Sequence, residues 1–458
     1  MICSNNARKN HNVFPVESTP PVSEINQSMN MISTENLIER RNNILGKAYS
    51  LFYERPLHLV KGEGVWLIAA DGRRYLDAYN NVPHVGHCHP HVVEAICRQA
   101  ATLNTHTRYL HETILDYAEM LTARFSEGLD VAMFSCTGTE ANELALRIAR
   151  AHSGGSGMIV TPFAYHGNSW AVSQITTSDL PEAEREDNVV TVPAPDVYSG
   201  QYRGEDACEQ YLMHVHQAVE LLKSRGHRPA AMIVDTVFSS EGVPNVPAGY
   251  LAGAADIVRE AGGLFIADEV QPGFGRTGLN FWGFENHGLV PDIVTMGKPM
   301  GNGHPISAVV TTTALVDQFQ QQAEYFNTFG GNPVSCAAAK AVLEVMDAEN
   351  LQANALAVGR HLHNGLRALA DRHEMIGDVR GSGLFNAVEL VRNRESREAA
   401  DTEAVRVVNE MRDRGVLISE TGPRGNVLKI RGPMTFSKEN ADFLIEKLDE
   451  SLQVVNPS

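Results

Sequence analysis

The most informative pair of residues in this chain is a lysine and an aspartate that each follow a short apolar run. Asp268 ends the run in LFIADEV (264–270), and Lys298 follows the run in DIVTMGKP (292–299). If these runs are neighbouring strands of an open α/β sheet, their carboxyl ends share one crevice, where ligands bind. An amine facing a carbonyl and an acid facing a ring nitrogen are what pyridoxal phosphate requires. Alone, Lys298 is equally explained as a solvated loop lysine.

Three more segments carry groups that could hold such a cofactor. A Thr-Gly-Thr turn opens a strongly helical run, and backbone amides at a helix N-terminus bind anions, so Gly138 and Thr139 are candidate phosphate contacts. Tyr165 and His166 follow the next apolar run, where an aromatic ring could stack on a planar ligand. Thr328 lies in a Gly-rich turn and is another candidate phosphate contact. A helix cap, a core aromatic and a plain turn would explain these segments as well.

Residues beside the aspartate and late in the chain add to this set. Val270 would share the strand face of the aspartate and pack beneath a ring, and Gln271 could reach a ring hydroxyl. The run VLKIRGP places Lys429 and Arg431 on one strand face. Arginine is the preferred clamp for a carboxylate or phosphate, but a solvated edge strand would explain both basic residues equally well.

Composition and charge narrow the class of protein. The chain has 458 residues, 43% apolar and 20% charged, with a net charge of −17. A chain of this length should divide into two or three domains. The acidity argues against binding to nucleic acid or anionic membranes, and no apolar run is long enough to span a membrane. The scattered cysteines are typical of reduced thiols in a cytoplasmic protein. Cys88 lies among histidines in GHCHP, where a tight turn is favoured over a metal site.

The elements that must position these residues alternate along the chain. Short apolar runs between helix-like segments stand at 131–136, 157–162, 230–237, 262–270 and 292–297. Such runs predict a mainly parallel sheet covered on both faces, and therefore an α/β fold. Later helical stretches and short strand candidates predict a smaller α+β domain. We expect a mobile arm (1–32), a helix and hairpin that join the small domain (33–80), a large cofactor-binding domain (81–331) and the small domain (332–458).

The order of the motifs is more specific than any one of them. A Gly-Thr-Glu helix start is followed by Tyr-His-Gly, Asp-Glu-Val-Gln with GFGRTG, MGKPMGNG and Asn-Thr-Phe-Gly-Gly-Asn-Pro. From about residue 33 to 450 the chain resembles the class III pyridoxal-phosphate aminotransferases of fold type I. The resemblance implies two catalytic residues: Lys298, which forms a Schiff base with pyridoxal 5'-phosphate, and Asp268, which pairs with the pyridine nitrogen. The cofactor contacts that it implies beside these two are Gly138, Thr139, Tyr165, His166, Asp235, Val270, Gln271 and Thr328.

The resemblance also implies an assembly. Thr328 would reach the cofactor phosphate of a partner subunit, which implies an obligate homodimer, or a dimer of dimers, with active sites at the interface.

Three positions depart from the family's usual pattern. Thr137 replaces a serine, and Asp235-Thr236 stands where many members have Glu-Pro. Ser240 stands where ornithine- and aminobutyrate-type members carry a glutamate that pairs with the late arginine. Arg431 would then be free to bind a substrate carboxylate or another anion, and an ornithine-type activity is set aside.

Segments 80–90, 108–112 and 192–205 are similar to one branch of the family. That branch contains the ethanolamine-phosphate and phosphohydroxylysine phospho-lyases beside bacterial aminotransferases. We expect an aminotransferase that moves an amino group from a primary amine or amino acid to a 2-oxo acid by a ping-pong mechanism. The alternative is a phospho-lyase acting on O-phosphoethanolamine or a related phosphorylated amine, whose phosphate Arg431, Lys429 or Arg108 could hold. A racemase or epimerase is a third option.

Overall fold

The computed structural model describes residues 33–456, so the predicted arm at 1–32 lies outside the described residues. The chain divides into two compact units, 1–58 and 59–458, and this division falls inside the predicted segment 33–80. The other predicted domain boundaries remain predictions. In the first unit, Ser33 caps helix α2 (Thr34–Leu45) by accepting a hydrogen bond from the backbone N–H of Asn36 at 3.2 Å.

The largest sheet of the second unit has seven strands in the order β4-β10-β9-β8-β7-β5-β6. Their bounds are β4 (Val131–Ser135), β5 (Gly157–Val160), β6 (Val189–Thr191), β7 (Pro229–Asp235), β8 (Leu264–Asp268), β9 (Ile293–Met296) and β10 (Ser307–Thr311). Only β10 runs antiparallel to its two neighbours in this sheet, and the other pairings are parallel. The predicted mainly parallel α/β fold is confirmed, with β6 and β10 in addition to the five predicted strands.

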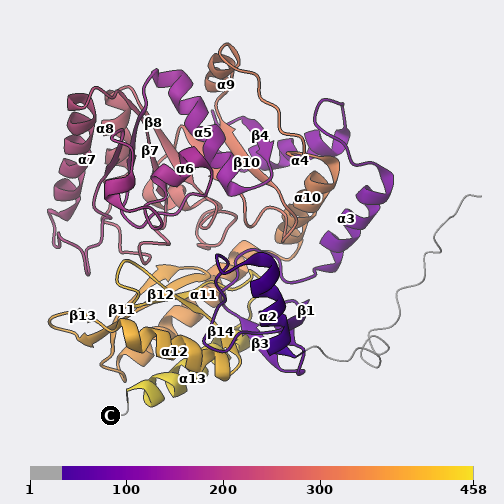
Figure 1. Cartoon of the computed structure of the whole chain (residues 1–458), viewed down its shortest axis with the longest axis vertical. Helices are drawn as coiled ribbons and strands as arrows, with labels where there is room; N and C mark the ends of the chain where they lie inside the picture. Colours follow the sequence, from indigo (N-terminus) through magenta and orange to yellow (C-terminus); the bar gives the residue numbers. More distant parts are fainter. Residues whose placement is uncertain (1–32, 457–458) are drawn as a thin grey trace, which may run out of the picture. The chain divides into compact units, whose positions relative to one another are not determined.

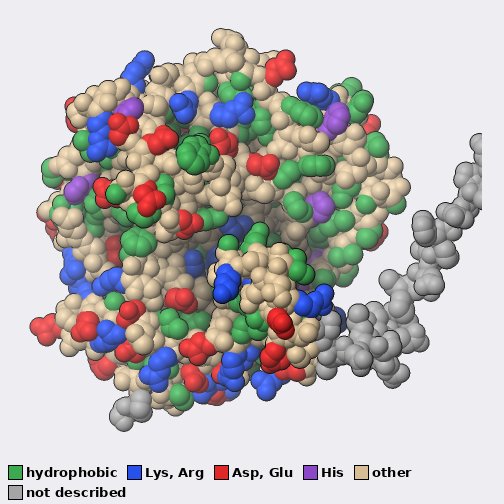
Figure 2. All heavy atoms as spheres, in the orientation of Figure 1, with side chains coloured by type: hydrophobic (Ala, Val, Ile, Leu, Met, Phe, Trp, Pro, Cys, Tyr) green, Lys and Arg blue, Asp and Glu red, His purple; other side chains and the backbone are tan. Residues whose placement is uncertain are grey.

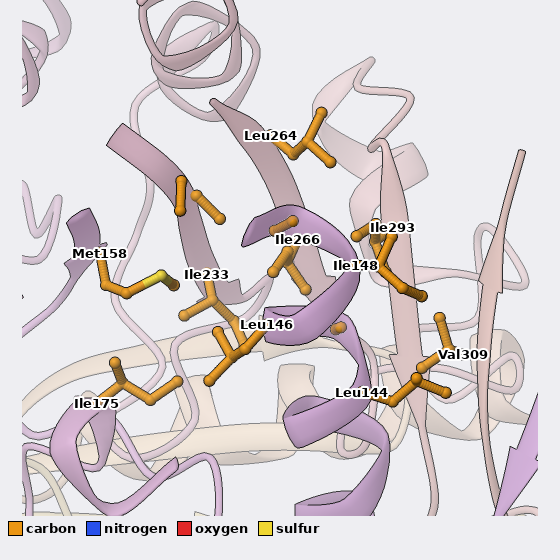
Figure 3. Packing of buried hydrophobic residues seen from close by; sticks show 14 of the residues in the cluster. Leu144, Leu146, Ile148, Met158, Ile175, Ile233, Leu264, Ile266, Ile293 and Val309 are labelled. Atoms are coloured by element: carbon orange, nitrogen blue, oxygen red, sulfur yellow. The ribbon is translucent and has the colours of Figure 1, made fainter. Parts of the chain in front are cut away.

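Helices cover this sheet because its central strands are apolar on both faces. Every residue of β7 and β8 is buried. In Figure 3, Leu144, Leu146 and Ile148 of helix α5 (Gly138–Ser153) lie among Ile233, Ile266 and other strand residues of one cluster. Because side chains alternate along a strand, the other face is left to helices α7 (Ala207–Ser224) and α8 (Tyr250–Glu260). These two helices pack on each other and contact β5 to β8 (Figure 1).

Two smaller sheets complete the second unit. The first contains β1 (Leu59–Glu63), β2 (Trp66–Ala69), β3 (Arg74–Asp77) and β14 (Val416–Leu417). The second contains β11 (Ile376–Ser382), β12 (Phe385–Asn393), β16 (Val427–Ile430) and β15 (Ser419–Thr421), with β13 (Glu398–Ala399) beside β12. Strands β2 and β3 form the hairpin that was expected within residues 33–80. The parallel pairing of β14 with β3 joins an early segment of the chain to a late one.

The remaining helices are α3 (Pro90–Thr102), α4 (Glu112–Thr122), α6 (Trp170–Ile175), α9 (Thr313–Gln320), α10 (Pro333–Ala348), α11 (Leu351–Ala370), α12 (Asp401–Asp413) and α13 (Lys438–Val455), with 3-10 turns η1 (Glu182–Glu184) and η2 (Gly283–His287). Among the helices of residues 33–456, none has the length and apolar character needed to cross a membrane. On the face that Figure 2 shows, acidic and basic side chains are interspersed rather than gathered in one basic patch.

Candidate active site

One cavity, with a volume of about 120 Å³, lies at the carboxyl ends of the central strands. It is lined by Gly138, Thr139, Tyr165, His166, Asp235, Asp268, Val270, Gln271 and Lys298. The register pairs Asp235 of β7 with Asp268 of β8, and Asp268 with Thr295 of β9. Lys298 follows β9, so the two strand ends that the sequence analysis singled out do share a crevice.

Asp268 is held in one orientation by hydrogen bonds to both carboxylate oxygens. Oδ1 accepts from the backbone N–H of Val270 at 3.1 Å. Oδ2 accepts from Asn142 Nδ2 at 2.9 Å and lies 2.7 Å from His166 Nδ1. Asn142 comes from α5 and was missed by the sequence analysis, where its only signal was a polar residue on an otherwise apolar helix face. A carboxylate fixed in this way is suited to face a single ligand atom.

The neighbouring acid, Glu269, has a structural role. Its side chain is fully buried and accepts hydrogen bonds from Thr236 Oγ1 at 2.6 Å and from the backbone N–H groups of Gly283 at 2.7 Å and Phe284 at 2.9 Å. Burial raises the pKa of Glu269 to about 8, and these hydrogen bonds act in the opposite direction. Glu269 therefore anchors the start of η2 while Asp268 faces the cavity.

The N-terminus of α5 borders the same cavity. Thr137 and Glu140 form a capping box there, which confirms the expected helix start. A Cβ added at Gly138 would lie 3.1 Å from Cγ2 of Val270, so the backbone passes very close to the strand end. Thr139 Oγ1 lies 3.3 Å from Asn168 Oδ1. The backbone N–H groups of a helix start beside a hydroxyl make this corner suited to an anion.

Lys298 has an environment that favours its neutral amine. Burial lowers the pKa of Lys298, and the positive charge of Arg431 lowers it further, while Asp268 and Asp235 act in the opposite direction. A neutral amine is the form that attacks a carbonyl carbon.

Lys429 and Arg431 are buried, so the explanation of a solvated edge strand is wrong. Strand β16 lies between β12 and β15, and the two side chains are 8% and 5% exposed. Burial lowers the pKa of Lys429 to about 7, and the positive charges of Arg431 and Lys298 contribute to this shift. Lys429 Nζ donates to the backbone carbonyl of Ser239 at 3.2 Å.

Arg431 is not free, contrary to what the serine at position 240 led us to expect. Its Nη1 donates to Gln271 Oε1, and its guanidinium lies 5.0 Å from the ring centre of Tyr79. Gln271 therefore serves as the hydrogen-bond partner of Arg431 that the missing glutamate would have been. Arg431 Nε is buried and has no hydrogen-bond partner among the described residues, so this donor is available to an acceptor.

Besides Lys429 and Arg431, two residues named in the sequence analysis, Thr328 and Arg108, are absent from the lining of the cavity. Thr328 is exposed in the turn after β10 and α9. The Arg108 guanidinium lies 3.9 Å from the ring centre of Phe326, also away from the cavity.

The histidines around Cys88 do not converge. Each pairs with a carboxylate of its own: His87 with Asp77, and His89 and His91 with Glu349 and Glu344 at the end of α10. Cys88 has a φ of 54°, the conformation of a tight turn. Within residues 33–456, no group of three or more His, Cys, Asp or Glu side chains is placed to hold a metal ion.

Residues 52–452 match the model of the family "Aminotransferase class-III". The chain belongs to the class III aminotransferase family. A Drosophila melanogaster protein named alanine–glyoxylate aminotransferase 2-like is 42% identical over 94% of this chain and 90% of the relative. A Caenorhabditis elegans protein named ethanolamine-phosphate phospho-lyase homolog 1 is 36% identical over 97% of this chain and 98% of the relative. A phospholyase from Arthrobacter, solved with phosphoethanolamine, is 46% identical with a TM-score of 0.88, over 91% of this chain and 99% of that one.

This membership establishes the fold as fold type I and the cofactor of the class III family as pyridoxal phosphate. The cavity fits that cofactor on its own geometry. It combines an amine with a lowered pKa, a carboxylate fixed by three hydrogen bonds and an anion-binding helix start in one place.

Proposed function

We propose that this enzyme is a pyridoxal-phosphate-dependent phospho-lyase that acts on O-phosphoethanolamine or a related phosphorylated amine. The observation that carries the proposal is the pair of buried basic residues, Lys429 and Arg431, next to the cofactor cavity. In the part of the chain that the structure describes, neither forms an ion pair with a carboxylate. Asp235 favours both charges without forming an ion pair with either, but buried cations that lack a direct ionic partner are still costly, and a phosphate dianion would offset that cost.

The comparisons favour this activity over the aminotransferase that the sequence analysis expected first. The Arthrobacter phospholyase is 46% identical, and its structure contains a phosphorylated amine. The C. elegans relative carries a phospho-lyase name and spans nearly the whole chain.

Each residue of the cavity would have a separate role in binding the cofactor or in catalysis. When bound, pyridoxal phosphate supplies an electron sink for a carbanion at the carbon that bears the amine. Lys298 Nζ would carry the cofactor and then accept the proton from that carbon. Asp268 would stabilise a proton on the ring nitrogen, since a carboxylate favours a neighbouring positive charge. The cofactor phosphate would be held by Gly138 and Thr139.

The substrate's phosphate would be held at the other side of the cavity. Lys429 and Arg431 would bind it equally well before and while it departs with the electron pair of the broken C–O bond. Hydrolysis of the remaining unsaturated amine gives an aldehyde and ammonia. The full reaction of phosphoethanolamine with water therefore yields phosphate, acetaldehyde and ammonia.

An aminotransferase is the second candidate because relatives from Drosophila melanogaster and Arabidopsis thaliana, each 42% identical, carry that name. It would use the same residues up to proton removal. Lys298 would then return the proton to the cofactor, and a 2-oxo acid would take the amino group in a second half-reaction. The two activities differ in whether an oxo acid is required.

The assembly and location also belong to the proposal. The exposed position of Thr328 supports a homodimer in which this residue reaches the partner's cofactor phosphate. A cytoplasmic location remains a prediction, since the Arabidopsis relative is named as mitochondrial.

The test of the assignment is Lys298→Ala, with Lys223→Ala as the matched control. Lys223 lies exposed on α7, where it pairs with Glu220 at 2.9 Å. We expect Lys298→Ala to lose phosphate release from phosphoethanolamine while still binding the cofactor non-covalently, and the control to keep wild-type rates. Near-normal phosphate release by Lys298→Ala would contradict the assignment of Lys298 as the catalytic residue.

A further inference from the structure

We propose that Ser239 is a positioning residue that anchors both basic residues of the substrate-anion site and sets their place relative to the cofactor cavity. This inference rests on the proposed function and adds to it the element that orients the phosphate. Ser239 lies in the loop after β7 and is fully buried. No motif in the sequence marks it.

The hydroxyl of Ser239 is the middle link of a hydrogen-bond chain. Arg431 Nη1 donates to Gln271 Oε1, Gln271 Nε2 donates to Ser239 Oγ, and Ser239 Oγ donates to Asp235 Oδ2. The two ends fix these directions, because a guanidinium can only donate and a carboxylate can only accept. A chain that runs from a cation to an anion is polarised along its length, which strengthens each link.

The carbonyl of Ser239 anchors the second basic residue. It accepts from Lys429 Nζ at 3.2 Å and from Thr421 Oγ1 at 3.2 Å. The hydroxyl thus orients Arg431 through Gln271, and the carbonyl of the same residue orients Lys429. One residue therefore couples both cations to Asp235, which lines the cofactor cavity.

The backbone around Ser239 is suited to hold a fixed position. Phe238 and Val243 both have positive φ, at 51° and 55°, which non-glycine residues rarely adopt. The backbone N–H of Val243 donates to the carbonyl of Phe238 at 3.0 Å and closes this turn. Strained conformations persist where the surrounding structure over-determines them, and they cluster at ligand sites.

Removing the hydroxyl should therefore act on the anion site rather than on proton transfer. Gln271 would lose the acceptor that fixes its carboxamide, and Arg431 would lose its fixed partner. Lys298 and Asp268 share no hydrogen bond with Ser239 among the described residues, so the chemical step should change little. The expected signature is a change in KM with a nearly constant kcat.

The experiment compares Ser239→Ala, Ser239→Cys and Ser239→Thr in the cofactor-loaded enzyme, with Ser240→Ala as the matched control. The Ser240 hydroxyl makes no hydrogen bond within the described residues, although its carbonyl does. KM and kcat are measured for phosphoethanolamine, and the dissociation constant is measured for inorganic phosphate by calorimetry. We expect Ser239→Ala to raise KM and the phosphate dissociation constant roughly tenfold, with kcat within about threefold.

The other variants separate hydrogen bonding from packing. Ser239→Cys keeps the side-chain size but is a weak hydrogen-bond partner, so it should behave like Ser239→Ala. Ser239→Thr keeps the hydroxyl and should stay near wild type, as should Ser240→Ala. Wild-type KM and phosphate affinity in Ser239→Ala, or recovery of both in Ser239→Cys, would overturn the inference.

Two further measurements keep the inference separate from the proposed function and from misfolding. Calorimetry with inorganic phosphate needs no turnover, so it tests the anchoring role even if the wild-type enzyme releases no phosphate from phosphoethanolamine. If the position 239 variants do not fold, Gln271→Met interrupts the same hydrogen-bond chain at the neighbouring residue. We expect the same tenfold loss of phosphate affinity there, and an unchanged affinity would contradict the role of the chain.

Discussion

The pH dependence of substrate binding should reveal the charge of Lys429. Its pKa is lowered to about 7 by burial and by Arg431, so the amine loses its positive charge as the pH rises through 7. A phosphate group, whose second pKa is near 6, is about nine-tenths dianion at pH 7 and changes little above that pH. With a pKa of 7, the charged fraction of the lysine falls roughly fivefold between pH 7 and pH 8, from about one half to about one tenth. We therefore expect KM for phosphoethanolamine to rise by about the same factor.

Two substitutions isolate this effect. Lys429→Arg keeps its charge throughout the range, so the rise in KM should disappear. Lys429→Met has no charge at any pH, and loss of a charged hydrogen bond of about 1.5 to 3 kcal/mol predicts a pH-independent KM roughly 10- to 150-fold higher. The assay is the initial rate of phosphate release between pH 6.5 and pH 8.5 at saturating cofactor.

The charged groups around Lys429 require one more control. Arg431, Asp235, Lys298 and Glu241 all act on its pKa, and burial raises the pKa of Glu241 itself to about 7. Glu241→Gln removes that second titration, and because the Glu241 carboxylate raises the pKa of Lys429, the rise in KM should persist but move to lower pH. A flat KM in the wild type, or the same rise in Lys429→Arg, would refute the reasoning.

Three more outcomes follow from the geometry of the site. Asp268→Asn should fold normally and lower kcat at least 100-fold, because the ring nitrogen loses its charged partner; a kcat within tenfold of wild type would argue against that pairing. Gly138→Ala puts a Cβ 3.1 Å from Val270 Cγ2 and should weaken cofactor affinity about tenfold, measured by reconstitution after dialysis, with wild-type affinity as the contrary result. Sedimentation at assay concentrations should find the activity in a dimer, because Thr328 is expected to act in the partner's site; an active monomer would rule this out.

The central strands and their functional ends could be predicted from the sequence because their signals are local. Continuous apolar runs that end in Asp268 and Gly297-Lys298 identify β8 and β9 without knowledge of any partner strand. The start of helix α5 at Gly138 could likewise be predicted from its capping residues. Strand β6 has three residues, and the antiparallel β10 does not follow the strand–helix alternation that revealed the others.

The anion site could not be predicted in detail because its contacts depend on packing between distant segments. Arg431 and Gln271 are 160 positions apart, and Lys429 and Ser239 are 190 apart. The role of both basic residues depends on whether β16 is a solvated edge strand or an internal strand. Its internal position results from pairing with β12 and β15, which lie elsewhere in the sequence. The role of Asn142 could not be predicted for a similar reason, since it consists of a hydrogen bond to Asp268 on another element.

The most direct test of the central claim is the amount of phosphate released per subunit when phosphoethanolamine is the only substrate. A phospho-lyase regenerates its cofactor in each cycle, so we predict many equivalents of phosphate, with matching acetaldehyde and ammonia, at a rate that added 2-oxo acid does not change. No catalytic phosphate release, with at most one equivalent of aminated cofactor per subunit and turnover only after a 2-oxo acid is added, would contradict the claim and identify an aminotransferase.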